Sequence, residues 1–364
     1  MRIAYDGTIF LRQPYGGISR YFLNLIEHIS LSAEVNVVAP FHQNQYLNDF
    51  KITNSKNTYL GPISTISSKI LQPYNHALIN REVLELNPHI IHESYYNFFR
   101  AGPKSTKIVI TIHDMIAEKF HSFLPFYDFS RYLKKLSIFR ADHIICVSES
   151  TKKDLLNVYD LDEKRISVVY HGVSTPKFRD SSFNINKSHF PFLLYVGQRW
   201  RHKNFDFLIK SFSQSSYLKN NFSLIIFGGP KFSSNELSIF ERFSILNKVT
   251  HINGDDIALD FLYRNASALV FPSLAEGFGL PIVEAMARGC PVIASNISSS
   301  NEIGSDGAIY FDPNSIEDFI FKAESLLSSK SKVKNLVLNG SEISKKFSWE
   351  NCARKTLEIY KKLL

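Results

Sequence analysis

The residues best suited to bind a charged ligand lie between Phe271 and Pro291. Two carboxylates, Glu276 and Glu284, stand in this stretch, and Gly277 and Gly279 lie where a loop meets the start of a helical pattern. Glycines let backbone N–H groups approach a ligand closely, and the N-terminus of a helix favours negative charge. The stretch therefore predicts a site for a phosphate-bearing ligand.

Two basic side chains, Arg199 and Lys203, lie on a loop between a predicted strand at 191–196 and a predicted helix at 205–212. A basic loop is usually only solvated. Combined with a glycine-lined helix start, however, two cations supply what a diphosphate needs. Glu284, on the helix that follows, would then suit a ribose, because a carboxylate accepts hydrogen bonds from paired hydroxyls.

The N-terminal half offers a second set of candidates. Gly16 and Gly17 follow a short strand at 2–6 and precede a helical pattern, a geometry that presents backbone amides to a phosphate. A glycine pair is also common in turns, so it does not decide the matter alone. His113 comes directly after a predicted strand at 107–112, where open α/β sheets bind ligands.

Several other chemistries are disfavoured. The Gly277-Phe278-Gly279 run lacks the third glycine of a dinucleotide fingerprint, since position 282 is Ile. Asp160 and Asp162 have the spacing of a metal–nucleotide pair but lie in a charged turn. His89 and His92 lack a third clustered ligand, so no metal site is expected. No P-loop motif and no G-x-S-x-G motif occur.

The elements that must position these residues alternate between strand and helix in both halves, which predicts two doubly wound parallel-sheet α/β domains. We expect a loop-rich stretch up to about residue 68 and a helix at 79–86. We expect residues 131–140 to form an amphipathic helix, with one face of Tyr132, Leu133, Leu136 and Phe139 and an opposite face of Arg131, Lys134 and Lys135.

A length of 364 residues exceeds what one hydrophobic core usually supports. A polar, aperiodic segment at 174–189 is the predicted linker, which gives domains of residues 1–173 and 174–347. Neither an apolar leader nor a run long enough to span a bilayer occurs, and the three cysteines are widely spaced, so we expect a cytoplasmic protein with reduced thiols.

The net charge is +8 and the pI is about 9.1, with basic residues gathered near 119–140 and 322–362. Such a pattern suits an anionic membrane surface or a polyanionic substrate, and it also suits an ordinary solvated face. No nucleic-acid partner is expected.

The stretch E-G-F-G-L-P-I-V-E-A-M-A-R-G-C-P, together with Y-G-G-I-S-R-Y, T-I-H-D and L-Y-V-G-Q-R-W-R-H-K-N-F, resembles glycosyltransferase family 4. The resemblance covers nearly the whole chain. It implies the GT-B fold, in which two Rossmann-like domains face each other and a C-terminal helix, here 348–364, crosses back to the first domain. It also implies transfer of a sugar from a nucleotide-diphosphate sugar with retention of configuration, no required cofactor or metal, and hinge closure around the donor.

The same resemblance implies roles for particular residues. Gly16 and Gly17 lie near the donor phosphates, and His113 contacts the donor sugar. Arg199 and Lys203 hold the diphosphate, whereas Glu284 binds the ribose. The transferred sugar is contacted by Glu276 and by the backbone of Gly277, Phe278, Gly279 and Leu280. Two departures are a W-R-H-K-N turn in place of the family's common versions, and His171 where many relatives carry Asn.

The N-terminal motif looks most like bacterial mannosyl- and related hexosyltransferases of surface-polysaccharide synthesis. This resemblance implies a GDP-hexose donor and a glycan or polyprenyl-diphosphate-linked acceptor, with peripheral contact at the inner face of the membrane as one option. Three alternatives stay open: a UDP-sugar-dependent transferase, a sugar-nucleotide epimerase of the same fold, and a catalytically silent binding subunit.

Overall fold

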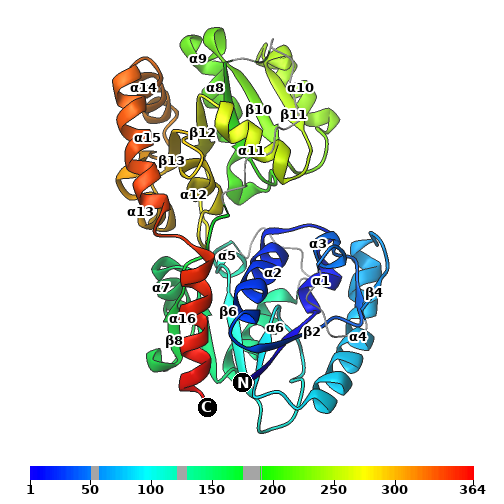
Figure 1. The fold of residues 1–364 in the computed structure, drawn as a ribbon. Helices are drawn as coiled ribbons and strands as arrows, with labels where there is room; N and C mark the ends of the chain where they lie inside the picture. Colours follow the sequence, from blue (N-terminus) through cyan, green and yellow to red (C-terminus); the bar gives the residue numbers. More distant parts are fainter. Residues whose placement is uncertain (51–56, 121–128, 175–188, 190) are drawn as a thin grey trace. The chain divides into compact units, whose positions relative to one another are not determined.

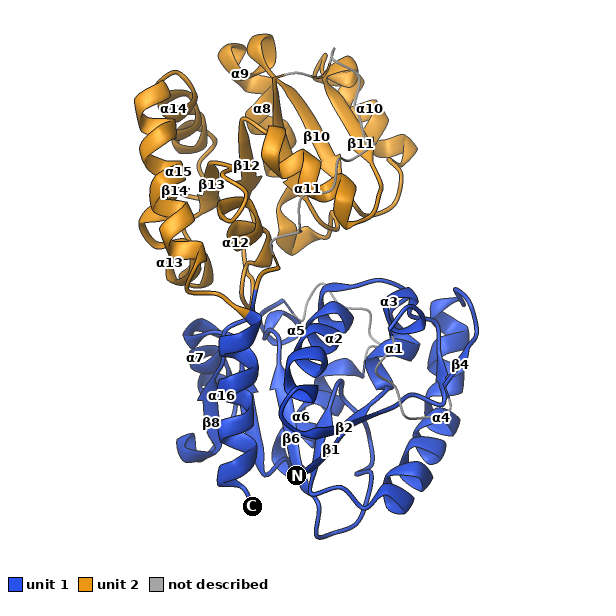
Figure 2. Cartoon of the chain, viewed as in Figure 1, with its two compact units in different colours: residues 1–172, 349–364 blue, residues 173–348 orange. Residues whose placement is uncertain are grey.

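The computed structural model describes residues 1–50, 57–120, 129–174, 189 and 191–364. The chain forms two compact units (Figure 2): unit 1 contains residues 1–172 and 349–364, and unit 2 contains residues 173–348. Each boundary lies one residue from the predicted one. Most of the predicted linker, 175–188, lies outside the described residues.

Unit 1 is built on a six-stranded parallel sheet with strand order β2-β1-β5-β6-β7-β8. These strands are short, apolar and almost wholly buried, as expected for a sheet covered on both faces. Their bounds are β1 (Arg2–Asp6), β2 (Glu34–Val38), β5 (Ile90–Glu93), β6 (Lys107–Ile112), β7 (His143–Cys146) and β8 (Ile166–Val168).

Helices cover both faces of this sheet (Figure 1). One core joins the sheet to α1 (Thr8–Arg12), α2 (Gly17–Ser30) and the C-terminal helix α16 (Trp349–Lys362). The other core joins it to α4 (Thr65–Leu86), α6 (Ser130–Arg140) and α7 (Glu149–Val158). Two short helices, α3 (Gln45–Asn48) and α5 (Ile116–Lys119), and the two-stranded pair β3 (Phe41–His42) and β4 (Thr58–Tyr59) complete the unit.

Unit 2 has a second parallel sheet with strand order β11-β10-β9-β12-β13-β14. Helices α8, α10 and α14 pack in one core and α11 and α12 in the other. The strands are β9 (Phe192–Val196), β10 (Ser223–Phe227), β11 (Val249–Ile252), β12 (Ala268–Phe271), β13 (Val292–Ser295) and β14 (Ala308–Phe311). The helices are α8 (Phe205–Gln214), α9 (Ser216–Asn221), α10 (Ser234–Arg242), α11 (Asp256–Asn265), α12 (Leu280–Met286), α13 (Ser298–Gly304), α14 (Ile316–Leu327) and α15 (Lys330–Ser344).

The two doubly wound α/β units predicted from the sequence are confirmed, and the C-terminal helix packs on unit 1 through a hydrogen bond between Tyr360 and Tyr5. In each sheet the chain runs outward in one direction and then returns to the other side of its first strand. This reversal lies between β1 and β5 in unit 1 and between β9 and β12 in unit 2. Ligands of doubly wound folds bind outside the carboxyl ends of the strands at such points.

Two local predictions were wrong. The helix expected at 79–86 ends at Leu86 as predicted, but its start was wrong: it begins at Thr65, where the Ser64 hydroxyl accepts a hydrogen bond from the Ser67 amide. The helix predicted at 131–140 is confirmed as α6, with Leu133 buried, but its two predicted faces were wrong at three positions. Tyr132 and Phe139 are exposed, whereas Lys134, expected on the polar face, is buried. The reason is an ion pair between Lys134 Nζ and Glu118 Oε2 at 2.7 Å, which offsets the cost of burying the ammonium group.

Candidate functional site

In unit 2, the loops that follow β9 and β12 are joined at the topological switch point. The Leu274 amide donates to the carbonyl of His202 at 2.7 Å, and Lys203 Nζ lies 2.6 Å from Glu276 Oε1. A single tight helical turn, Arg201–Lys203, and Asn204 in the left-handed conformation bring Lys203 to this position. The sequence-predicted pair of Lys203 and Glu276 therefore shares one place at the carboxyl edge of the sheet.

The Lys203–Glu276 pair is only partly shielded from solvent, with 20% and 10% of the respective side chains exposed. Lys203 also lies over the ring of Phe271, 5.8 Å from its centroid. An ammonium group has three donors, and Glu276 accepts from one of them here. Lys203 can therefore bind an anionic oxygen while it keeps its carboxylate partner.

Arg199 takes a different direction from Lys203. Its Nε lies 2.5 Å from Glu236 Oε1 on α10, and its Nη2 donates to the carbonyl oxygens of Pro230 and Lys231. Burial raises the pKa of Glu236, but hydrogen bonds from Arg199 and Ser233 outweigh it, so the pKa is lowered overall. Arg199 Nη1 is buried and has no hydrogen-bond partner within the part of the chain that the structure describes.

Glu284 lies on α12 and is 6% exposed. Its Oε2 accepts a hydrogen bond from the hydroxyl of Tyr263 on α11, at 3.0 Å. Arg288, one turn later, donates to the Glu284 carbonyl and pairs with Asp260, which ties α12 to α11. The carboxylate is thus held in a fixed orientation, as a group that recognises paired hydroxyls would need to be.

The glycine-bearing loop ends where Gly279 precedes the first turn of α12. Gly279 has φ of 100°, a left-handed conformation that favours glycine. The ring of Phe278 is buried and meets that of Phe347 edge-on at 5.7 Å. Of the four predicted backbone contributors Gly277, Phe278, Gly279 and Leu280, Phe278 therefore also anchors the loop to unit 2.

In unit 1, Gly16 and Gly17 lie at the start of α2. A Cβ added at Gly16 would meet the side-chain amide of Gln13, whereas one added at Gly17 would meet nothing within 4 Å. The Gln13 Oε1 also accepts from the Ser19 amide, which fixes this loop on the helix. Gly17 is thus the position where a side chain would fill open space at a helix N-terminus.

His113 directly follows β6 and is surrounded by aromatic rings. Its ring centroid lies 5.0 Å from that of Tyr21 and 5.7 Å from that of His171. Burial lowers the pKa of His113 to about 3, and His92 and Lys134 act in the same direction. Its Nε2 is buried and has no hydrogen-bond partner within the described residues. A neutral imidazole with an unused nitrogen can accept or donate one hydrogen bond to a ligand.

Lys134 holds the backbone next to His113. The sequence did not predict this role. Its ammonium group donates to the carbonyl of Asp114, the residue after His113, at 3.0 Å, and also pairs with Glu118. Lys134 lies over the ring of Tyr96, at 5.5 Å. In the sequence, Lys134 is a lysine next to Leu133 in a helical pattern. Such a lysine is expected on the solvent-exposed face, and only the tertiary fold shows that it is buried.

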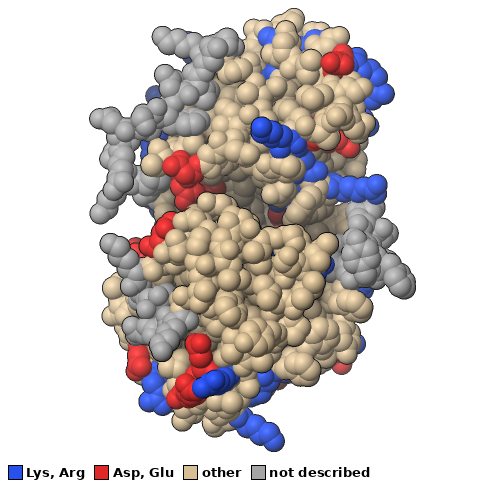
Figure 3. Space-filling model, turned by 90° about the vertical axis from the view of Figure 1, so that its right-hand side faces the viewer, with Lys and Arg blue, Asp and Glu red and all other residues tan. Residues whose placement is uncertain are grey.

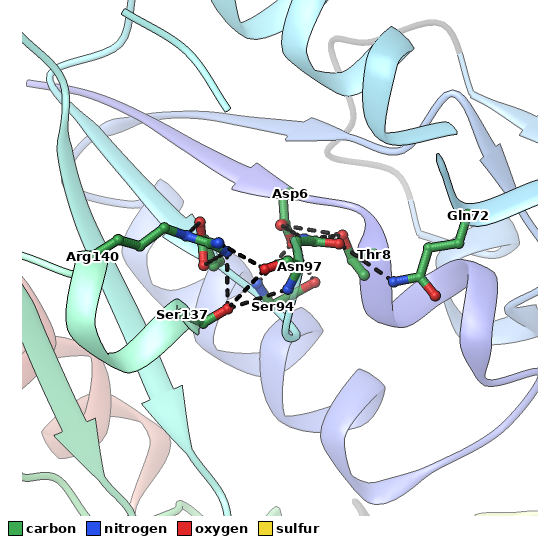
Figure 4. A network of polar contacts seen from close by, with 8 residues as sticks. Asp6, Thr8, Gln72, Ser94, Asn97, Ser137 and Arg140 are labelled. Carbon is green, nitrogen blue, oxygen red and sulfur yellow. Dashed lines mark hydrogen bonds and ion pairs between the residues drawn. The ribbon is translucent and has the colours of Figure 1, made fainter. Parts of the chain in front are cut away.

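A buried polar network at the β1/β5 switch point was also missed (Figure 4). Asp6 Oδ1 accepts from both the amide and the hydroxyl of Ser94, and Oδ2 accepts from Asn97 and Thr8. These hydrogen bonds hold the loops that follow β1 and β5 together. Burial nevertheless raises the pKa of Asp6, outweighing the hydrogen bonds from Ser94.

The network continues to the surface of unit 1 on one side and to α6 on the other. Gln72 donates to Asn97 and accepts from Arg12. Arg140 forms a two-point ion pair with Glu93, and burial raises the pKa of that glutamate to about 7 although Arg140 opposes the change. This hydrogen-bonded edge, which ends in the half-buried side chains of Arg12 and Gln72, is suited to a hydroxyl-rich ligand.

No group of three or more His, Cys, Asp and Glu side chains that could hold a metal ion occurs within the described residues. The three cysteines are free and buried. Among the helices that the structure describes, none has the length and apolar character needed to cross a membrane.

Two doubly wound units, each with loops at the carboxyl edge of its switch point, form the architecture of GT-B glycosyltransferases. Two family models match the chain: Glycosyltransferase Family 4 over residues 15–177 and Glycosyl transferases group 1 over residues 177–342. The chain therefore belongs to the glycosyltransferase family that these two models describe together, and it is a glycosyltransferase, as the resemblance implied.

Two named relatives agree with this assignment, and a solved structure is similar in fold. The chain is 32% identical to the O-antigen chain mannosyltransferase RfbU of Salmonella typhimurium, over 63% of this chain and 64% of RfbU. It is 26% identical to the O-antigen chain mannosyltransferase B of Escherichia coli over the full length of both. The fold is similar to that of sucrose-phosphate synthase from Thermosynechococcus elongatus, with a TM-score of 0.79, 21% identity and coverage of 100% and 99% of the two chains.

Proposed function

We propose that this glycosyltransferase moves mannose or a related hexose from GDP-mannose or a similar nucleotide sugar to a glycan or polyprenyl-diphosphate-linked acceptor, in bacterial O-antigen synthesis. The names of the two mannosyltransferases similar to this chain support the choice of sugar and pathway. The observation that carries the donor site is the pairing of Lys203 with Glu276, which sets a cation beside a carboxylate at the β9/β12 switch point.

In this proposal each group has a separate task. Lys203 binds the diphosphate and stabilises the charge that develops as the sugar leaves, in place of a metal ion. Glu276 accepts hydrogen bonds from hydroxyls of the transferred sugar, and Glu284 accepts them from the ribose. Arg199 supports the diphosphate through its unused Nη1, while Glu236 and two carbonyls hold the rest of the guanidinium group.

Unit 1 takes the acceptor in this proposal. The network of Asp6, Ser94 and Asn97 lies at its switch point and ends in the polar side chains Gln72 and Arg12, which can bind sugar hydroxyls. His113 keeps the role that the resemblance implies, contact with the donor sugar, through a neutral ring whose Nε2 has no partner within the described residues. Retention of configuration follows a front-face route, in which the leaving phosphate takes the acceptor proton.

A binding experiment with a panel of GDP- and UDP-sugars tests the donor assignment. Titration calorimetry should give tighter binding of GDP-mannose than of UDP-glucose to the wild-type protein. The Lys203→Met variant should bind the favoured nucleotide sugar more weakly than the wild type does. Tighter binding of a UDP-sugar would move the proposal to a UDP-dependent transferase, and interconversion of the bound sugar without an acceptor would favour an epimerase.

A further inference from the structure

The N-terminal half of α4 turns polar side chains toward the body of unit 1 and apolar ones toward solvent. Ile66 and Ile70 are exposed, whereas Gln72 is half-buried and His76 is buried. Lys69, Gln72 and His76 are spaced three and four residues apart, so they lie on one face of the helix. We call these three residues the polar row. Buried polar side chains normally have hydrogen-bond partners, and not all of these do.

His76 is buried in the polar row without a hydrogen bond. The side chain is 9% exposed, and neither ring nitrogen meets a partner in hydrogen-bond geometry within the described residues, the nearby Phe99 backbone included. Burial lowers the pKa of His76 although the Asp6 carboxylate opposes the change, so the ring is neutral at pH 7 and lies close to Asp6. A neutral imidazole has one donor and one acceptor, and leaving both unused in the interior is costly. Hydroxyl groups of a ligand would satisfy them.

Arg12, at the end of α1, is a half-buried cation without a carboxylate partner. Its Nη1 donates to Gln72 Oε1 at 3.3 Å, and its guanidinium group lies over the ring of Tyr95, 4.5 Å from the centroid. Arg12 forms no ion pair within the described residues, unlike Arg140, which is paired with Glu93. A guanidinium group has five N–H donors, so most of those of Arg12 remain available to a ligand.

The elements that carry these groups contain no carboxylate beside them. Neither α1 nor residues 65–80 of α4 include an acidic residue. Figure 3 shows the side of unit 1 on which α4 lies, and few charged side chains appear across its centre. The carboxylate of Asp6 already accepts hydrogen bonds from its neighbours (Figure 4). Arg12 and the exposed Lys69 therefore bring positive charge to this edge without an acidic partner on α1 or on the first half of α4.

We propose that Arg12 binds an anionic group of the acceptor, next to a sugar whose hydroxyls contact Gln72 and His76. The proposal rests on the proposed function and deepens it by giving the acceptor a charge. The anionic group is the diphosphate of a lipid-linked sugar or the carboxylate of an acidic sugar. Both present paired oxygens that the planar guanidinium group binds through parallel N–H donors.

The same geometry limits how far the charge lies from the acceptor sugar. Arg12 is bonded to Gln72, and one turn of helix, about 5.4 Å, separates Gln72 from His76, so a single sugar can reach both members of the polar row. The anionic group is therefore attached directly to the sugar that the polar row contacts. If that group is a diphosphate, transfer takes place on the first sugars of a lipid-linked chain, before a longer glycan separates the diphosphate from the acceptor hydroxyl.

Binding to the full chain, saturated with GDP or with UDP if UDP binds more tightly, tests the proposal, because the nucleotide occupies the donor's diphosphate site. The probes are galactose, glucose and N-acetylglucosamine, each as its methyl glycoside and as its methyl diphosphate ester, together with methyl glucuronide. At least one charged probe should bind about tenfold or more tightly than its neutral counterpart. Preference for a diphosphate identifies a lipid-linked acceptor, and preference for the glucuronide identifies an acidic sugar.

Three variants assign the binding to residues. Arg12→Gln should abolish the preference for the charged probe and leave the Kd for the neutral probe within about twofold. Arg81→Gln, an exposed arginine on the same helix that pairs with Glu85, is the matched control and should bind every probe as wild type does. His76→Leu should weaken charged and neutral probes alike by about fivefold. Its Tm should equal or exceed that of wild type, because an apolar side chain replaces an unpaired buried ring.

Equal affinity of wild type for the charged and neutral member of every pair overturns the proposal, as does a preference that Arg12→Gln retains. A His76→Leu variant that loses stability and binds the probes normally overturns the assignment of His76. Titration with GDP-mannose keeps the proposed function separate. Arg12 is assigned no contact with the donor, so Arg12→Gln should bind GDP-mannose as wild type does, whereas a wild type that binds no nucleotide sugar contradicts the proposed function itself.

Discussion

Lys203 Nζ and Glu276 Oε1 lie 2.6 Å apart, although the two residues follow different strands of the unit 2 sheet. Their contact ties the loop after β9 to the loop after β12 at the point where the strand order reverses. A cation and a carboxylate are thereby positioned before any ligand arrives. In the proposed reaction, one faces the diphosphate and the other the sugar.

Lys203→Met should lower kcat for sugar transfer by about 100-fold or more, the usual effect of removing one donor to a developing charge. Loss of the charged hydrogen bond to Glu276 should lower the free energy of unfolding by about 1.5–3 kcal/mol, which leaves the protein folded at assay temperature. Lys210→Met, an exposed lysine on the neighbouring helix α8, is the matched control and should transfer at the wild-type rate. Equal rates for the two variants would remove Lys203 from the diphosphate site.

Arg199→Ala should lower stability as well as turnover. The guanidinium group is 6% exposed, and its loss leaves Glu236 and two carbonyls without a charged donor. Hydrogen bonds to charged groups contribute about 1.5–3 kcal/mol each, so the free energy of unfolding should fall by at least that amount. Urea denaturation measures the change. An unaltered midpoint would show that the pair with Glu236 contributes nothing to the fold.

Gly17→Ala should change stability and activity in opposite directions. The added Cβ meets no atom, and replacing a helical glycine should raise the free energy of unfolding by up to about 1 kcal/mol. If the open space at Gly17 admits a donor phosphate, transfer should nevertheless fall at least tenfold. Normal activity with improved stability would remove Gly17 from the residues that contact the donor phosphates.

Tyr263→Phe removes the hydrogen bond that orients Glu284. The Kd for GDP should rise by about fivefold, corresponding to roughly 1 kcal/mol for one hydrogen bond. The Kd for 2′,3′-dideoxy-GDP should stay unchanged, because that nucleotide lacks the hydroxyls Glu284 is assigned to bind. An equal loss for both nucleotides would contradict the ribose assignment.

Acid should destabilise the protein through His113. Its pKa is about 3 in the folded chain because of burial, whereas the unfolded chain takes up the proton near the ordinary value of about 6.5. The unfolded state therefore binds more protons between these values, and stability falls as pH drops below about 6.5. His113→Gln should flatten the slope of unfolding free energy against pH by up to about 1.4 kcal/mol per unit. An unchanged slope between pH 6 and pH 4 would contradict a buried neutral ring.

The fold and the loops of unit 2 could be predicted because they depend on local patterns. Buried apolar runs such as β6 define the strands, and Gly279 marks the start of α12. Lys203 and Glu276 were both named from the sequence, but their contact required the strand order. Glu236, the partner of Arg199, carried no signal, since it occurs in an ordinary helix start.

Unit 1 was harder to predict because tertiary contacts decide which side of a helix is buried. Lys134 turns inward to Glu118 and the Asp114 carbonyl, which exposes Tyr132 and Phe139. In α4, the buried residues Asn75 and His76 are polar while Ile66 and Ile70 are exposed. In the first half of α4 the apolar residues therefore do not mark the buried side, although Ile79 and Val83 in the second half are buried.

Release of nucleotide in the presence of an acceptor tests the proposed reaction most directly. The protein is incubated with GDP-mannose and a polyprenyl-diphosphate-linked glycan, and free GDP and product are measured, with the anomeric configuration assigned by NMR. GDP release only with the acceptor, together with an α-linked mannose, is the predicted result. No release from GDP-mannose or any other nucleotide sugar, with the acceptor present, would contradict sugar transfer by this protein.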